Sequence, residues 1–209
     1  MMIHKLLALL FCSLIVFGGT ATGCKKKNGK EIIISGSRTM EQALASLAES
    51  YNKNQEITIT IITPGSVKGL ALLSEGRCDI ASSSVKMPAQ MAWVAQKEGI
   101  AVKELIIAYD IIVPIVHPSN QVKNLFQGQM ADMYSGLIKD WKAVEVKPGK
   151  IIVVDRDDDS GTRLFMNERF FELKKPIETG IKVKSDADAV AYVGKHPSSV
   201  GYVSKRHVN

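Results

Sequence analysis

The fold is decided by residues 31–66, which read EIIISGSRTMEQALASLAESYNKNQEITITIITPGS. The segment Glu31–Ser35 is short and apolar, and Ile57–Thr63 is β-branched almost throughout, so both are predicted to be strands. Between them, Thr39–Asn52 has apolar residues at the spacing of one helix face, which predicts a helix. A strand, a helix and a second strand in this order are typical of a parallel sheet.

The same alternation continues toward the C-terminus. Further helices are predicted at Ser66–Glu75, Ala89–Glu98, Gln129–Tyr134 and Thr162–Glu172, and further strands at Asp79–Ala81, Ile111–Val116, Ile151–Val154 and Val200–Val203. The run Ile111–Val116 is apolar throughout and is expected to be buried on both sides. The order predicts an α/β fold with mostly parallel sheets and helices on both faces. The length of 209 residues allows one large domain or two small ones.

The N-terminus is typical of an exported protein. Lys5 precedes the apolar run Leu6–Gly18 and then small residues up to Gly23, so residues 1–23 are predicted to be a signal peptide. The apolar run is too short for a membrane span. Cys24 follows small residues and precedes a polar stretch, which resembles a bacterial lipoprotein signal, although Ala21 replaces the usual leucine. We therefore expect Cys24 to be lipidated and residues 24–30 to form a Lys-rich tether.

The net charge of +6 does not indicate nucleic-acid binding. Five of the 27 Lys and Arg residues lie within residues 1–30, so residues 31–209 hold 22 cations and all 21 acids. A nearly neutral body with a basic tether fits attraction to anionic lipid better than a nucleic-acid footprint. With Cys12 removed and Cys24 lipidated, Cys78 is the one remaining thiol, and we expect it to be a small, half-buried hydrophobic residue and not a catalytic one. Trp93 and Trp141 are also expected to pack internally.

Hydroxyl and glycine clusters mark the predicted ends of strands. They are Gly36-Ser37-Arg38-Thr39, Pro64-Gly65-Ser66, Ser82-Ser83-Ser84 and Asp159-Ser160-Gly161-Thr162, with Arg156 and Arg163 beside the last. Each cluster alone is an ordinary helix cap. In an α/β sheet, however, such loops meet at the carboxyl ends of the strands, where ligands bind. Hydroxyls, free backbone N–H groups and guanidinium forks together suit a tetrahedral oxyanion.

The sequence resembles the phosphate-binding, PstS-like branch of the periplasmic solute-binding proteins of ABC transporters. The resemblance spans residues 31–203 and rests on segments that occur in family order: 36–40, 64–66, 76–84, 108–110, 117–120, 134–136 with Trp141, 156–162 and 201–203. It implies two α/β lobes, hinged about two crossover strands, that close on an anion. By this likeness the first lobe holds residues 31–108 plus 191–209, and the second holds residues 109–190.

The resemblance also implies which residues contact the ligand. The implied contacts are Ser37, Arg38, Thr39, Ser66, Ser84, Arg156, Ser160, Gly161 and Thr162. The resemblance further implies that Asp158 orients the side chain of Arg156 without contacting the ligand itself. Ser84 stands where some members carry a carboxylate that accepts the proton of hydrogen phosphate, which relaxes the expected selectivity against sulfate. Val85 stands where many serine-bearing relatives place an arginine, and our hypothesis is that Arg38 supplies that charge.

Other chemistries are poorly matched. Residues Ser83–Lys86 fit an S-x-x-K pattern, but the companion motifs of serine acyl-transferases are missing. Asp155, Asp157 and Asp159 alternate as in a calcium loop, but Gly and Glu are missing at positions six and twelve. The four His are scattered, and residues 65–69 lack the Walker spacing. We therefore expect no metal, no cofactor and no catalysis.

The sequence thus predicts a monomeric solute-binding lipoprotein in the periplasm or at the cell surface. Its expected partners are inorganic phosphate or a related oxyanion, an ABC transporter permease, and the membrane through the lipid anchor. The alternative is a signalling or adhesion lipoprotein that keeps the fold and regulates a protein partner. The anion loop at residues 156–162 favours the first interpretation, and the missing carboxylate and the end of the chain soon after residue 203 favour the alternative.

Overall fold

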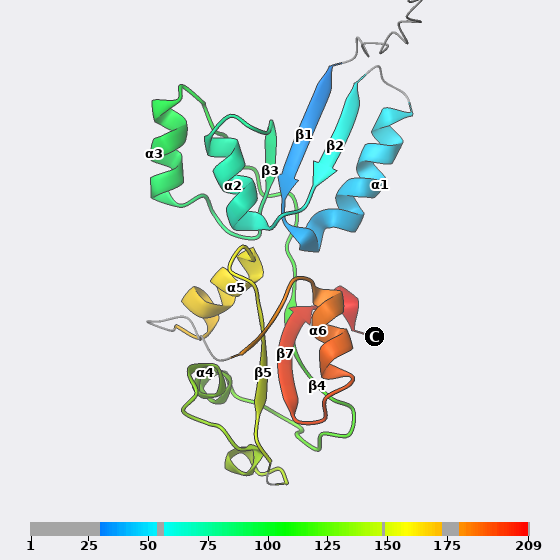
Figure 1. The fold of residues 1–209 in the computed structure, drawn as a ribbon, viewed down its shortest axis with the longest axis vertical. Helices are drawn as coiled ribbons and strands as arrows, with labels where there is room; N and C mark the ends of the chain where they lie inside the picture. Colours follow the sequence, from blue (N-terminus) through cyan, green and yellow to red (C-terminus); the bar gives the residue numbers. More distant parts are fainter. Residues whose placement is uncertain (1–29, 54–56, 148, 173–179, 209) are drawn as a thin grey trace, which may run out of the picture.

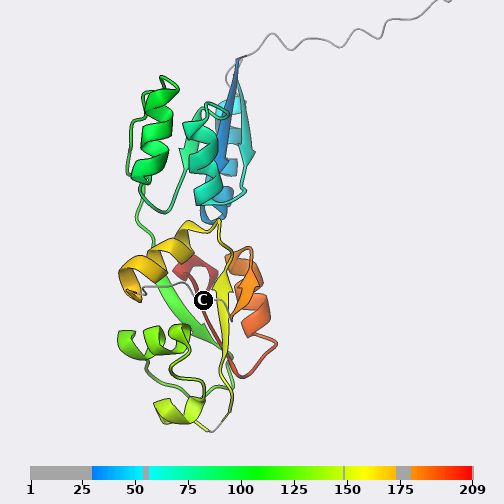
Figure 2. The same cartoon turned by 60° about the vertical axis from the view of Figure 1, so that its left-hand side comes forward.

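The computed structural model describes residues 30–53, 57–147, 149–172 and 180–208. These residues form two α/β lobes stacked along the long axis of the molecule (Figures 1 and 2). The α/β fold with mainly parallel sheets is therefore confirmed. The predicted signal peptide, the lipidation site Cys24 and the tether up to residue 29 lie outside the described residues.

The first lobe is built on a three-stranded parallel sheet in the order β2-β1-β3. Its strands are β1 (Glu31–Gly36), β2 (Thr58–Ile62) and β3 (Ile80–Ser82). Its helices are α1 (Glu41–Asn52), preceded by the 3-10 turn Arg38–Met40, then α2 (Ser66–Ser74) and α3 (Ala89–Lys97). The βαβ unit predicted from residues 31–66 is present, with each element within two residues of its predicted bounds.

The second lobe is built on a four-stranded sheet in the order β4-β7-β5-β6, in which only β4 is antiparallel to its neighbour. Its strands are β4 (Ile112–Val116), β5 (Ile152–Arg156), β6 (Ile181–Val183) and β7 (Ser199–Ser204). Its helices are α4 (Gln127–Ser135), α5 (Gly161–Phe165) and α6 (Asp186–Val193), with short 3-10 turns at Trp141–Val144 and Lys205–His207. Where one helix was predicted at Thr162–Glu172, α5 passes into a π-helical turn at Met166–Phe170.

The last strand lies in the second lobe, which corrects the expectation that residues 191–209 return to the first. Strand β7 runs between β4 and β5, and all six of its residues are buried. Such a strand needs a neighbour on each edge and apolar side chains on each face. Val200 and Tyr202 join one core cluster of the second lobe, and Val203 joins the other. Helix α6 packs against β7, β5 and β4, so the C-terminal part of the chain belongs to the second lobe.

The run Ile111–Val116 is less buried than predicted, since Ile111 is exposed and four of the five residues of β4 are only partly buried. Strand β4 is the edge of its sheet, and Pro114 at its centre is exposed. This fits the general rule that proline, which cannot donate a ladder hydrogen bond, is confined to edge strands. Residues 105–107 are also about two-thirds exposed. Trp93 is exposed as well, whereas Trp141 is buried as predicted, and Cys78 is buried more completely than the half-buried position predicted for it.

The lobes touch directly at the level where α2 meets α5 (Figure 1). The amide of Val67 donates to the carbonyl of Asp159 at 3.2 Å, and the guanidinium of Arg206 donates to the carbonyl of Thr39. These contacts bring the carboxyl ends of β1, β3 and β5 to one interface. None of the described helices is long and apolar enough to cross a membrane.

Candidate functional site

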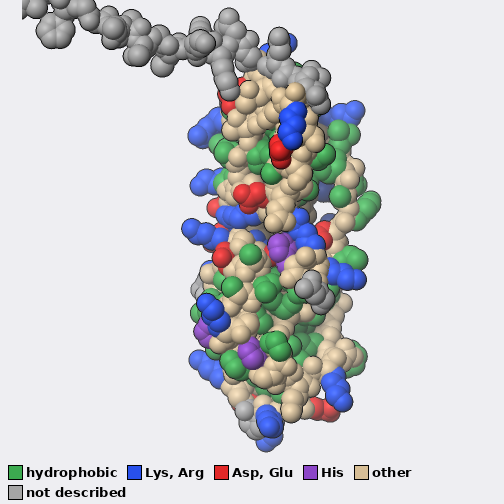
Figure 3. All heavy atoms as spheres, turned by 90° about the vertical axis from the view of Figure 1, so that its right-hand side faces the viewer, with side chains coloured by type: hydrophobic (Ala, Val, Ile, Leu, Met, Phe, Trp, Pro, Cys, Tyr) green, Lys and Arg blue, Asp and Glu red, His purple; other side chains and the backbone are tan. Residues whose placement is uncertain are grey.

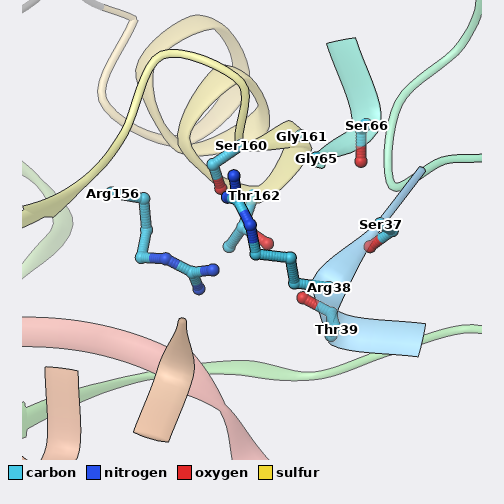
Figure 4. Close-up of a pocket in the computed structure, with 9 residues that line it drawn as sticks. All are labelled: Ser37, Arg38, Thr39, Gly65, Ser66, Arg156, Ser160, Gly161 and Thr162. Atoms are coloured by element: carbon cyan, nitrogen blue, oxygen red, sulfur yellow. The ribbon is translucent and has the colours of Figure 1, made fainter. Parts of the chain in front are cut away.

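A small polar pocket lies where the two lobes meet (Figure 4). Its lining residues are Ser37, Arg38, Thr39, Gly65, Ser66, Arg156, Ser160, Gly161 and Thr162. The free space is close to that of one water molecule, so binding any larger ligand requires the lobes or the lining side chains to move apart. Every predicted contact residue except Ser84 lines it, and Gly65 is the addition.

The first lobe supplies its lining hydroxyls from residues that follow β1, which are Ser37 and Thr39, and from Ser66, the first residue of α2. Gly36 has φ of +144°, and a Cβ there would overlap the carbonyl of Ser82 on the neighbouring strand. This close approach lets the amide of Ser37 donate to the carbonyl of Ser82 at 2.8 Å. Ser37 is thereby held directly after the carboxyl end of β1 with its side chain buried.

Ser84 contacts the lining residues Ser37 and Ser66 but does not itself line the pocket. Its hydroxyl is 3.1 Å from that of Ser37, and its amide donates to the hydroxyl of Ser66 at 3.2 Å. Ser84 therefore holds two lining side chains in place. Its predicted direct contact with a ligand stays a prediction.

The second lobe supplies the loop that opens α5. Ser160 is the N-cap, and its hydroxyl accepts from the amide of Arg163 at 3.2 Å. A Cβ at Gly161 would stand 2.7 Å from the Cβ of Ser66 in the first lobe. The two helix starts therefore meet across the pocket, which places the hydroxyl of Ser66 against the backbone of residue 161.

Arg156 is the buried cation of the site. Its side chain is 3% exposed and pairs with Asp186, which is equally buried. One terminal nitrogen donates to Asp186 and the other to the carbonyl of Lys184 at 2.8 Å. The third nitrogen, Nε, is buried and has no hydrogen-bond partner among the described residues. Such an unpartnered charged donor is uncommon in protein interiors.

Arg38 is the second cation of the pocket and spans both lobes. Its guanidinium donates to Asp157 at 2.9 Å and to the carbonyl of Lys184 at 3.1 Å in the second lobe. It also donates to the carbonyl of Pro64 in its own lobe. Arg38 thus lines the pocket, as predicted, and also ties the lobes together. On the face shown in Figure 3, Lys and Arg side chains gather at this junction.

The predicted role of Asp158 is wrong. Its side chain is 86% exposed and pairs with Arg163 at 2.8 Å, whereas Arg156 pairs with Asp186. Neighbouring aspartates of the loop have different partners, since Asp157 pairs with Arg38. The family resemblance was the basis for predicting that role for Asp158. Asp186 lies thirty residues farther along the chain from Arg156 and was not implied by that resemblance.

A buried network under the loop was also missed. Asp155 accepts from Arg163 at 2.8 Å, from Lys182 at 2.6 Å and from the hydroxyl of Tyr202. Burial, together with the charge of Asp155, raises the pKa of Tyr202 well above its usual range, so the phenol stays protonated and donates. Because Arg163 belongs to α5 and Asp155 to β5, this network fixes the helix start against the strand.

Known proteins match this chain over most of its length. A family model described as PBP superfamily domain matches residues 21–208. The phosphate-binding protein PstS of Bacillus subtilis is 30% identical over 189 residues, covering 88% of this chain and 60% of the relative. PstS of Borreliella burgdorferi is 30% identical over 191 residues, covering 86% and 66%. This chain therefore spans about three-fifths to two-thirds of the length of these curated relatives.

Two solved structures have similar folds. A substrate-binding protein of a phosphate ABC transporter from Clostridium perfringens, with bound phosphate, has a TM-score of 0.76 and 28% identity, covering 86% of this chain and 72% of that one. An ABC-type phosphate transport receptor from Vibrio cholerae has a TM-score of 0.70 and 29% identity, covering 86% and 73%. Similarity in fold therefore accompanies similarity in sequence over most of the chain.

Proposed function

Since this chain belongs to the PBP superfamily and is similar to PstS proteins, we propose that it captures inorganic phosphate, or a similar tetrahedral oxyanion, for an ABC importer. The relatives are named for phosphate binding, and the Clostridium perfringens structure has phosphate bound. Capture takes place outside the cytoplasm, in the periplasm or at the cell surface.

The buried Nε of Arg156 is the observation that carries this proposal. A charged N–H group without a partner costs free energy, because it has lost its water and gained nothing in return. An oxyanion in the pocket supplies the missing acceptor. The hydroxyls of Ser37, Ser66 and Thr162 line the same pocket and can complete its coordination.

The lining residues indicate modest selectivity between phosphate and sulfate. Among the described residues that line the pocket, none is a carboxylate. A carboxylate would repel fully ionised sulfate, whereas a hydroxyl can either accept the proton of hydrogen phosphate or donate to sulfate. Sulfate is therefore expected to compete with phosphate.

Binding without chemistry is part of the proposal. Solute-binding proteins are not an enzyme class, and the described lining residues are Ser, Thr, Gly and Arg. Arginine stays protonated at all physiological pH values and cannot serve as a general base. We also propose that the protein acts as a monomer held to the membrane by lipid on Cys24.

Calorimetric titration tests the function. The protein without residues 1–23 and with Cys24→Ser is freed of carried-over anion and titrated with phosphate, and then with phosphate in the presence of sulfate. Saturable binding that Arg156→Ala abolishes is the expected result. The absence of heat and of thermal stabilisation with every tetrahedral oxyanion would contradict it and favour the alternative, a lipoprotein that regulates a protein partner.

A further inference from the structure

One short segment of the second lobe contacts both arginines of the pocket. It runs from Lys184, which follows β6, to Asp186, the first residue of α6. The carbonyl of Lys184 accepts from Arg156 at 2.8 Å and from Arg38 at 3.1 Å. The carboxylate of Asp186 accepts from Arg156 as well. A single carbonyl thus links a guanidinium from each lobe.

Asp186 is built rigidly into this position. It is the first residue of α6, behind the N-cap Ser185, whose hydroxyl accepts from the amide of Asp188 at 3.0 Å. The side chains of Asp186 and Arg156 are each 3% exposed, so water screens their interaction little. The other carboxylate oxygen of Asp186 lies 3.7 Å from Nε2 of His207. Neither partner can turn away without leaving a charge buried and unpaired.

This arrangement decides which part of Arg156 is available to a ligand. A guanidinium has five N–H groups, and one on each terminal nitrogen is used by Asp186 and Lys184. The N–H of Nε and one N–H on each terminal nitrogen are left. The Nε group and its neighbouring terminal nitrogen form a fork that matches two oxygens of an oxyanion.

We infer that Asp186 is the positioning residue that orients Arg156 for anion binding, an inference that rests on the proposed function. Asp186 holds one edge of the guanidinium and thereby presents the Nε edge. Asp158, the neighbour in sequence, cannot do this because it points to solvent and pairs with Arg163. The carbonyl of Lys184 also accepts a hydrogen bond from Arg38, so segment 184–186 fixes the orientation of both guanidinium groups of the pocket.

Asp186→Asn tests this inference, with Asp158→Asn as its matched control. Both changes replace one carboxylate by an amide of the same shape in the same lobe. Asp186→Asn is expected to weaken phosphate binding by roughly thirtyfold or more, because a buried charge loses its partner. Asp158→Asn is expected to stay within about twofold, as for an exposed ion pair. Asp186→Glu keeps the charge but displaces it, and it should recover part of the lost affinity.

A spectroscopic readout separates positioning from general destabilisation. The Nε–Hε resonance of Arg156 is followed by NMR, with each variant's melting temperature as the folding check. An ordered Arg156 signal in the wild type, lost in Asp186→Asn but kept in Asp158→Asn, supports the inference. Equal phosphate affinities, or an unchanged Arg156 signal in Asp186→Asn, overturn it. If Asp186→Asn does not fold, Asp186→Glu is compared with wild type in the same two measurements.

The two proposals fail in different ways. If the wild type binds no oxyanion, the proposed function fails, and the Arg156 resonance alone still decides whether Asp186 orders the guanidinium. If the wild type binds phosphate and Asp186→Asn binds it equally well, the positioning role fails and the proposed function stands.

Discussion

Gly161 of the second lobe lies directly against Ser66 of the first. A Cβ at position 161 would stand 2.7 Å from the Cβ of Ser66 and 3.1 Å from that of Ser84. Real Cβ atoms do not approach each other as closely as 2.7 Å, so the absence of a side chain at residue 161 is what lets the two lobes meet here. The pocket is lined from both sides of this contact.

Gly161→Ala is therefore expected to weaken oxyanion binding by about tenfold or more, because the added methyl group separates the lobes by overpacking. Gly128→Ala, in α4, is the matched control, since no heavy atom lies within 4 Å of the corresponding Cβ. Calorimetric titration of both variants checks the expectation. Equal affinities would show that the lobes do not need this contact to hold the ligand.

Arg38 and Asp157 form an ion pair across the lobes with both side chains largely shielded from water. Arg38→Ala is expected to weaken phosphate binding and to favour the open form, because the pocket loses a cation and the lobes lose a tie. A double-mutant cycle on the free energy of unfolding, built from Arg38→Ala, Asp157→Ala and the double variant, should give a coupling energy of about 0.5–3 kcal/mol between the two side chains. Tight binding by Arg38→Ala would sink the idea that this residue supplies charge to the site.

Tyr202 donates to Asp155, which is 1% exposed. Tyr202→Phe removes one donor to a buried carboxylate and should lower the free energy of unfolding by about 1.5–3 kcal/mol. Tyr109→Phe serves as the control, because Tyr109 is 89% exposed. Chemical denaturation measures both changes. A cost for Tyr202→Phe no larger than for the control would mean that Arg163 and Lys182 satisfy Asp155 without the phenol.

Burial raises the pKa of the Cys78 thiol, and the charge of Asp79 adds to the effect. The unfolded chain therefore loses the thiol proton at a lower pH than the folded protein does. The contribution of Cys78 to stability should be constant below pH 9.0, the ordinary value, and should decline as the pH rises through it. Comparing wild type with Cys78→Ala across pH 7 to 10 checks this. A stability difference that grows with pH would contradict the sign.

The sequence predicted the site in the parts that depend on local structure. Ser37, Ser66 and Ser160 each follow a strand and precede a helix, and the carboxyl ends of parallel strands meet at one edge. This is why the sequence alone was enough to place these hydroxyls together. The partner of Arg156 could not be placed in this way. Asp186 is buried beside Arg156, whereas Asp158 is exposed and pairs with Arg163. This difference depends on the tertiary path of the chain, which local sequence patterns do not encode.

The order of strands and helices, the hydroxyl clusters and the two pocket arginines were determined by the sequence itself, because periodicity and capping act over a few residues. Tertiary structure decided the rest. Strand β7 entered the second sheet because its two faces complete two separate cores. Arg156 forms its ion pair with Asp186, and Arg38 forms its ion pair with Asp157. These partners could not be read from the sequence, because pairing between charges distant in the chain depends on which side chains the packed lobes bury together.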